Sequence, residues 1–229
     1  MAFIPRQTIE TEAEKLLFQY GQAVAPVTAP PIPVDEICES YLGISIEFDD
    51  LRSKHGPKVL AAMYILSKRV IIDESLVPED HPDQEGRYNF TLGHETGHWI
   101  LHRHDAIAVK DTPDLFGNVA NPVVCRSSSK DPVEIQADLF SSCLLMPADM
   151  VRDAWRQLGH DGQLNVYEEI QAKQSMFGCA VDGLEPISYV VKEIADVFHV
   201  SQRAMQIRLK GLGLLDINKP SPQLSFSFA

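Results

Sequence analysis

Cysteine is scarce in this chain, and the few cysteines are not grouped. The four of them, Cys38, Cys125, Cys143 and Cys179, are scattered through 229 residues with no Cys-x-x-Cys pair. This spacing disfavours both a zinc ribbon and the disulfide framework of a small secreted domain. We therefore expect free thiols, with Cys38 and Cys143 in the core.

Long apolar runs and an excess of positive charge are also absent. No stretch is long enough to cross a bilayer, and the start Met-Ala-Phe-Ile-Pro-Arg lacks the apolar region of a signal peptide, so we expect a cytoplasmic protein without membrane contact. The formal net charge of −12 opposes general binding to nucleic acid, because phosphates repel an acidic surface. An acidic chain would instead attract a basic partner, such as a DNA-binding protein.

The remaining composition, 45% apolar and 23% charged, is ordinary for a globular protein. Its patterning predicts an α+β fold in which a small antiparallel or mixed sheet packs on buried helices. Strands are expected at 44–48, 59–66 and 69–73, the last two as a hairpin around Ser67-Lys68. Helices are expected at 8–22 with Thr8 as cap, 34–41 ending at Gly43, 87–102, within 132–147, and at 149–158, 190–197 and 202–210.

We predict four parts along the chain. Residues 1–30 form an N-terminal helix and a proline-rich connector, 31–160 the core, 161–216 a C-terminal helical lobe, and 217–229 a mobile tail. The lobe has the layout of a helix-turn-helix in which Ser201 caps the second helix. We favour a packing or partner-docking role for it over DNA binding, in which Arg203 and Gln206 would face the groove and Arg208 would be required for binding.

The chain is organised around His94-Glu95-x-x-His98, which lies in an apolar helical pattern. Residues four apart share one helix face, so both imidazoles point at the same spot, as two zinc ligands must. Two histidines and a carboxylate in a buried helix need partners, and a metal supplies them. Glu95 is then placed to act on a water held at that metal.

Zinc needs a third protein ligand, and three residues are candidates for it. His104 stands where the metzincin pattern places its last histidine, but that pattern needs glycine at position 101, where this chain has leucine. His102 lies two turns from His94, about 12 Å along the helix, which is too far for one ion; it could act behind a ligand, in a substrate cleft or in packing.

The best candidate for the third ligand is Glu134, in a second apolar helical segment. Asp138 lies four residues on, and a carboxylate there can accept a hydrogen bond from a ligand histidine and so orient it. The other explanation of Glu134 is a favourable charge near the start of its helix, just after Pro132.

Three segments give the chain a resemblance to the ImmA/IrrE family of bacterial zinc metallopeptidases. They are Arg87-x-x-Phe-Thr-Leu-Gly-His-Glu-x-Gly-His98-x-x-x-His102, then Cys125-Arg126, then Glu134-x-x-Ala-Asp138-x-Phe-x-x-x-Leu-Leu-Met-Pro147. The resemblance extends from about Pro30 to Leu215. It implies a gluzincin-like site in which His94, His98 and Glu134 bind the metal and Glu95 is the base. It also implies a substrate class, repressor proteins cut to switch on stress or mobile-element genes.

The expected activity is therefore zinc-dependent endopeptidase cleavage of a protein, with a nearby-encoded helix-turn-helix repressor as the expected partner and manganese as the other candidate metal. One alternative is a DNA-binding regulator with a structural or vestigial metal. Another is a toxin-like member of a toxin–antitoxin operon. Arg87 and Tyr88, a turn or two before His94, either contact substrate or close a structural ion pair.

Overall fold

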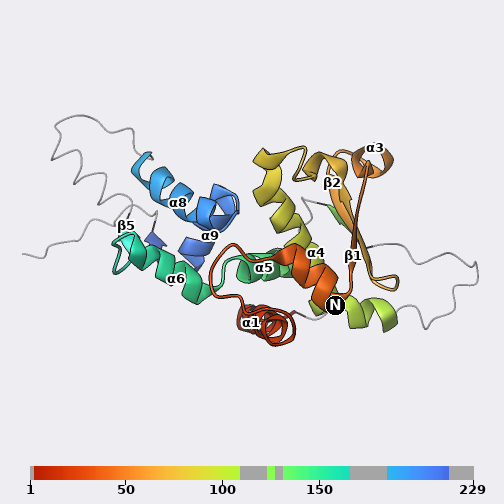
Figure 1. The fold of residues 1–229 in the computed structure, drawn as a ribbon, viewed down its shortest axis with the longest axis horizontal. Helices are drawn as coiled ribbons and strands as arrows, with labels where there is room; N and C mark the ends of the chain where they lie inside the picture. Colours follow the sequence, from red (N-terminus) through yellow and green to blue (C-terminus); the bar gives the residue numbers. More distant parts are fainter. Residues whose placement is uncertain (1–2, 109–122, 127–130, 166–184, 217–229) are drawn as a thin grey trace, which may run out of the picture.

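The computed structural model describes residues 3–108, 123–126, 131–165 and 185–216, with only the backbone described for 105–108, 123–126 and 185–188. The fold is α+β with helices dominant, as predicted. In Figure 1 the sheet lies at one end of the molecule, α6, α8 and α9 at the other, and α1 and α5 between them. In the described part of the chain, no helix has the length and apolarity needed to cross a membrane.

The main sheet is mixed and has the order β1-β3-β2-β4. Its strands are β1 (Ser45–Asp49), β2 (Val59–Tyr64), β3 (Arg69–Asp73) and β4 (Val123–Arg126). The predicted hairpin β2–β3 is confirmed, but its turn is wider than Ser67-Lys68 because β2 already ends at Tyr64. The strand β4 was not predicted, since its segment has no alternation and pairing with β2 from far along the chain creates it.

Two helices at the centre carry the residues singled out in the sequence, α4 (Glu85–Ala108) and α5 (Pro132–Leu145). They pack closely because two glycines of α4 face α5. A Cβ on Gly93 would lie 2.6 Å from Ser141 Oγ, and one on Gly97 would lie 3.1 Å from Ala137 Cα. The Ser141 hydroxyl also donates a hydrogen bond to the Phe90 carbonyl at 2.9 Å. Small residues therefore set the short distance between the two helices.

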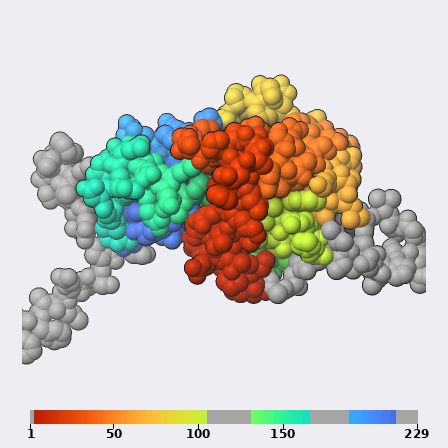
Figure 2. All heavy atoms as spheres, turned by 60° about the horizontal axis from the view of Figure 1, so that its bottom comes forward, coloured from red at the N-terminus to blue at the C-terminus, as the bar shows by residue number. Residues whose placement is uncertain are grey.

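The N-terminal helix α1 (Arg6–Ala23) packs against α5 through four buried residues, Ile9, Ala13, Leu16 and Tyr20. It begins after Pro5, two residues before the predicted start, so the expectation that Thr8 caps it is wrong. In Figure 2 this segment, in red, lies between the orange sheet half and the teal C-terminal half. The short elements that follow are α2 (Val34–Glu36), a π-helical turn (Ile37–Leu42) ended by Gly43, α3 (Leu51–His55), and 3-10 turns at Glu74–Leu76 and Pro82–Gln84.

The C-terminal elements are α6 (Ala148–Gln157), β5 (Leu164–Asn165), α8 (Glu185–Val197), α9 (Gln202–Gly211) and β6 (Leu215–Asp216). Ser201 caps α9 as predicted, accepting a hydrogen bond from the Ala204 amide. The parallel pair β5–β6 was not predicted. The helix pair is present, while its identity as a separate helix-turn-helix lobe stays a prediction. The predicted tail 217–229 lies outside the described residues.

Arg208 on α9 is buried, which contradicts the DNA contact that the alternative of a DNA-binding regulator requires of it. Its guanidinium donates to the Met146 carbonyl at 2.9 Å and to Glu10 of α1 at 2.6 Å. Only 1% of its surface is exposed. The reason is a partner 198 residues away in the sequence, which no local pattern could indicate. Cys38 and Cys143 are free and buried, which confirms the prediction that both lie in the core.

Candidate metal centre

Three side chains from α4 and α5 meet at one point. His94 Nε2 lies 3.0 Å from His98 Nε2, and the two carboxylate oxygens of Glu134 lie 3.4 Å from these two nitrogens, one from each. All three candidate ligand atoms lie within 4.8 Å of one another. The structure thus brings together the three residues that the sequence nominated, and it does so through the close packing of the two helices.

The residues fit a zinc ion in chemistry and in spacing. Zinc sites of the catalytic type use two imidazole nitrogens and a carboxylate oxygen, with bonds of about 2.0–2.2 Å in tetrahedral geometry. Those bond lengths put neighbouring ligand atoms about 3.3–3.5 Å apart. The observed separations of 3.0, 3.4 and 3.4 Å lie close to these values. Two histidines and a glutamate leave one tetrahedral position for water or substrate.

The Nδ1 atoms of both histidines have partners that fix the orientation of the rings. His94 Nδ1 lies 2.8 Å from Asp138 Oδ1. His98 Nδ1 lies 3.2 Å from His102 Nδ1, and His102 Nε2 lies 2.9 Å from Gln136 Oε1. His94 Nδ1 donates to Asp138, His98 Nδ1 donates to His102 Nδ1, and His102 Nε2 donates to Gln136 when the metal is bound. The Nε2 lone pairs of His94 and His98 then face the metal point. His102 therefore lies behind a ligand, and Gln136 is a participant that sequence reasoning missed.

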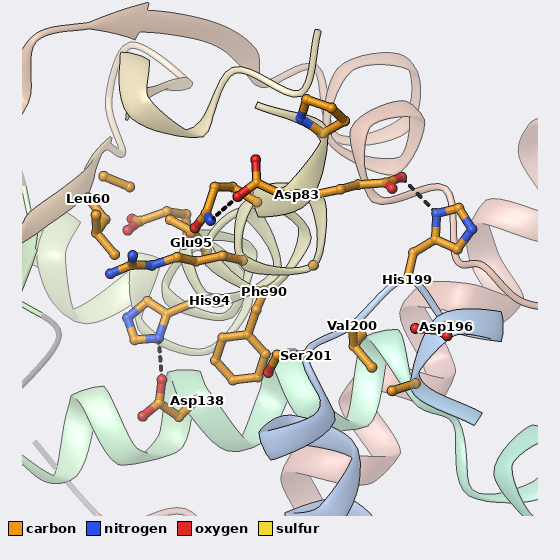
Figure 3. A pocket seen from close by; sticks show the side chains of 18 of the residues that line it. Leu60, Asp83, Phe90, His94, Glu95, Asp138, Asp196, His199, Val200 and Ser201 are labelled. Atoms are coloured by element: carbon orange, nitrogen blue, oxygen red, sulfur yellow. Dashed lines mark hydrogen bonds and ion pairs between the residues drawn. The ribbon is translucent and has the colours of Figure 1, made fainter. Parts of the chain in front are cut away.

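Glu95 is fully buried and lines a cleft of about 760 Å³ together with His94, Glu134 and Asp138. Figure 3 shows His94 and Asp138 pointing toward each other below Glu95 on this cleft. The far wall is the turn between α8 and α9, where His199, Val200 and Ser201 face the start of α4. His104 is exposed and is not part of the metal-binding group found among the described residues.

The turn is held against α4 by backbone proximity and by two polar contacts. A Cβ on Gly86 would come within 2.9 Å of the Val200 carbonyl carbon, so only glycine fits there. Asn89 donates to the His199 carbonyl at 3.0 Å, and His199 Nδ1 lies 2.7 Å from a Glu85 carboxylate oxygen. The C-terminal helix pair therefore forms one side of the cleft, a connection that no local pattern indicates.

A comparison with known families matches residues 39–210, most of the chain, to the IrrE N-terminal-like domain of the peptidase M78 family. The chain belongs to this family. The resemblance found from the sequence motifs is thereby confirmed. Membership supports a metallopeptidase-type function for the chain, and the group of His94, His98 and Glu134 could hold the metal.

No curated protein matches the chain. Among solved structures, a "Mycobacterium tuberculosis transcriptional regulator" matches at 14% identity with a TM-score of 0.49. The match covers 89% of this chain and 46% of that protein, so this chain spans about half the length of that structure. The likeness is distant, and nothing about activity follows from it.

The electrostatics of this M78 site couple the histidines to the carboxylates. Burial opposes a charge on His94, but hydrogen bonds to Asp138 and Glu134 outweigh it and raise the pKa of His94 to about 10. Burial likewise favours neutral Glu134, yet its bonds to His94 and His98 lower the pKa of Glu134 to about 2. The metal-free site therefore holds a charged imidazolium–carboxylate pair at neutral pH.

This pair stabilises the metal-free fold over a defined pH window. The raised pKa of His94 contributes fully below its ordinary value of 6.5, and the contribution is lost as pH rises through about 10. The lowered pKa of Glu134 contributes above its ordinary value of 4.5 and is lost as pH falls through about 2. Both contributions are complete only between those two ordinary values.

Zinc uptake should release a proton. A metal ligand must be deprotonated, so zinc has to displace the proton that His94 carries in the metal-free protein. We expect release of about one proton per zinc at about pH 7.5, and an affinity that falls as pH is lowered. Titration calorimetry in buffers of different ionisation enthalpy measures this number, and a value of zero would contradict the described charge state.

Removing the Asp138 carboxylate should weaken zinc binding without altering the ligand set. Partners of ligand histidines commonly contribute 10–100-fold in metal affinity, and we expect a loss of about that size for Asp138→Ala. Asp138→Asn should retain most of the affinity, because its amide oxygen can still accept from His94 Nδ1. Competition with a zinc chelator gives the affinities. Asp149→Ala on the exposed face of α6 is the control, and equal affinities for the two alanine variants would contradict the role of Asp138.

Proposed function

We propose that this chain is a zinc-dependent metallo-endopeptidase that cuts a protein substrate. The observation that carries the proposal is the convergence of His94, His98 and Glu134 beside the buried carboxylate of Glu95, on an open cleft. A purely structural zinc site has no need of a carboxylate at its open side. Membership of the M78 peptidase family supports the same class of chemistry.

Each residue has a distinct task in peptide-bond hydrolysis. A zinc ion, when bound, polarises the scissile carbonyl and lowers the pKa of water. Glu95 accepts a proton from the attacking water and passes it to the leaving amine. Asp138 and the His102–Gln136 pair hold the imidazoles in the orientation that presents Nε2 to the metal. The cleft positions the substrate beside these groups.

The proposed substrate is a DNA-binding repressor whose gene lies near that of this chain. Its support is the family resemblance together with charge complementarity, because a net charge of −12 attracts a basic protein. The test is incubation of the purified protein with zinc or manganese and the product of the adjacent regulator gene. One defined cut that a chelator prevents is the expected result; an intact regulator under both metals would reject this substrate.

The alternative function, a DNA-binding regulator, can no longer use one of the residues assigned to DNA contact. Arg208, which that hypothesis assigned to DNA, is buried against Glu10 and Met146. Arg203 on the same helix is exposed and remains the residue by which DNA binding can be tested. Steep salt dependence of binding to a specific sequence, lost in Arg203→Ala, would favour a regulator.

A further inference from the structure

Arg87 and Tyr88 are neighbours on α4, but their side chains lie in different surroundings. Tyr88 is buried, donates a hydrogen bond to Asp35 at 2.8 Å and stacks on the Phe48 ring. Arg87 is exposed and lines the cleft. It precedes His94 by seven residues, which is two helical turns, so both lie on the same face of α4. Tyr88 therefore has a structural role, and Arg87 is the residue of this pair that can contact a substrate.

The cleft is otherwise acidic. Among the described residues that line it, Arg87 is the single arginine or lysine, and the acids are Asp83, Glu85, Glu95, Glu134, Asp138 and Asp196. A carboxylate of a bound molecule is repelled along most of this surface. Away from the metal point, and with His199 paired to Glu85, Arg87 offers a favourable place for it, since a guanidinium binds a carboxylate with two parallel hydrogen bonds.

The acids nearest to Arg87 in the sequence are occupied elsewhere. Gln84 donates to Asp83 at 2.7 Å, and Glu85 pairs with His199, as the dashed lines in Figure 3 mark. Glu134 and Asp138 face the histidines. Within the part of the chain that the structure describes, Arg87 forms no hydrogen bond or ion pair. Its charge is therefore available to a ligand in the cleft.

We propose that Arg87 binds a carboxylate of the substrate and thereby sets which peptide bond reaches the metal. This inference rests on the proposed peptidase function and adds a specificity residue to it. Seven residues of helix span about 10 Å, and an extended peptide advances about 3.3 Å per residue. This is the separation of the two positions along the helix, so the carboxylate belongs within about three residues of the scissile bond. It comes either from an aspartate or glutamate side chain or from the substrate's C-terminus.

The test separates binding from cleavage. The full chain carrying Glu95→Gln, loaded with zinc, is immobilised and exposed to a pool of unstructured dodecapeptides with free or amidated C-termini, and bound peptides are identified by mass spectrometry. Acidic peptides should be enriched. Adding Arg87→Ala should reduce their retention about tenfold or more, as loss of a charged hydrogen-bond pair does, and Arg87→Lys should restore part of it. Arg87→Glu should shift the preference to lysine and arginine. Enrichment that requires a free C-terminus assigns the carboxylate to the chain end.

Arg203→Ala is the matched control, since Arg203 is also exposed but does not line the cleft. Equal retention of acidic peptides with and without Arg87, an equal loss in Arg203→Ala, or no enrichment of acidic peptides at all would each overturn the proposal. The zinc content of every variant should stay at one per chain. Cleavage of the same pool by the unmodified chain is scored separately. Peptides that bind through Arg87 but stay uncut count against the peptidase function alone, and cuts should fall within about three residues of the acid.

Discussion

Replacing Glu95 with glutamine should abolish peptide cleavage while one zinc per chain remains bound. Glu95 is fully buried beside His94 and His98, and it is not one of the three residues of the metal-binding group. Glutamine keeps the size of the side chain but does not accept a proton, so the attacking water loses its base. General-base catalysis typically contributes 10²–10⁴-fold, and we expect turnover to fall by at least about 10²-fold.

The measurement is cleavage rate together with zinc content for Glu95→Gln and for Glu193→Gln, an exposed glutamate outside the cleft. The control should cleave at the rate of the unmodified chain. Loss of zinc from Glu95→Gln would mean that the substitution damages the metal site instead of the chemistry. Undiminished cleavage with zinc retained would refute the role of Glu95 and with it the proposed mechanism.

Arg208→Ala should cost the fold about 3–5 kcal/mol, the usual range when one partner of a buried ion pair is removed. Arg208 joins α9 to α1 and α5. It donates hydrogen bonds to Glu10 on α1, to Cys143 Sγ on α5 and to the carbonyl of Met146, which follows α5. Truncation leaves the Met146 carbonyl and the Glu10 carboxylate without this donor and opens a cavity. For a chain of this size the melting temperature should fall by roughly 6–20 °C.

Thermal and denaturant unfolding of Arg208→Ala and Arg203→Ala decides the point. Arg203 is exposed on the same helix, and its removal should change stability by no more than about 0.5 kcal/mol. Arg208→Met, which fills the space without the charge, should lose less than Arg208→Ala because it leaves a smaller cavity. Equal stability of the two alanine variants, combined with lost DNA affinity in Arg208→Ala, would reverse the assignment and support a nucleic-acid role.

The features that the sequence predicts are those with a local signal. The spacing of His94 and His98, and of Glu134 and Asp138, follows from helix periodicity, and apolar residues around both pairs identified α4 and α5. The pairing of the two helices was inferred from chemistry, because an incomplete zinc ligand set calls for a third donor. Turn chemistry likewise located Gly43 at a helix end and Ser201 at a helix start.

The features that the sequence does not indicate depend on contacts between distant residues. The strand β4 exists through pairing with β2, and Arg208 is buried through Glu10. Gln136 reads as a polar residue in an apolar helix, and only the position of His102 on the neighbouring helix gives it a purpose. The far wall of the cleft was also invisible, since His199 reaches Glu85 across 114 residues of sequence.

Gly93 and Gly97 show where the precision of the metal group originates. Each lies on the side of α4 that touches α5, and neither carries a donor atom. A methyl group at Gly93 would displace the Ser141 hydroxyl, and one at Gly97 would press on the Ala137 backbone, on the helix that carries Glu134. The geometry of the metal group therefore depends on two glycines that do not bind the metal, as well as on the three side chains that would bind it.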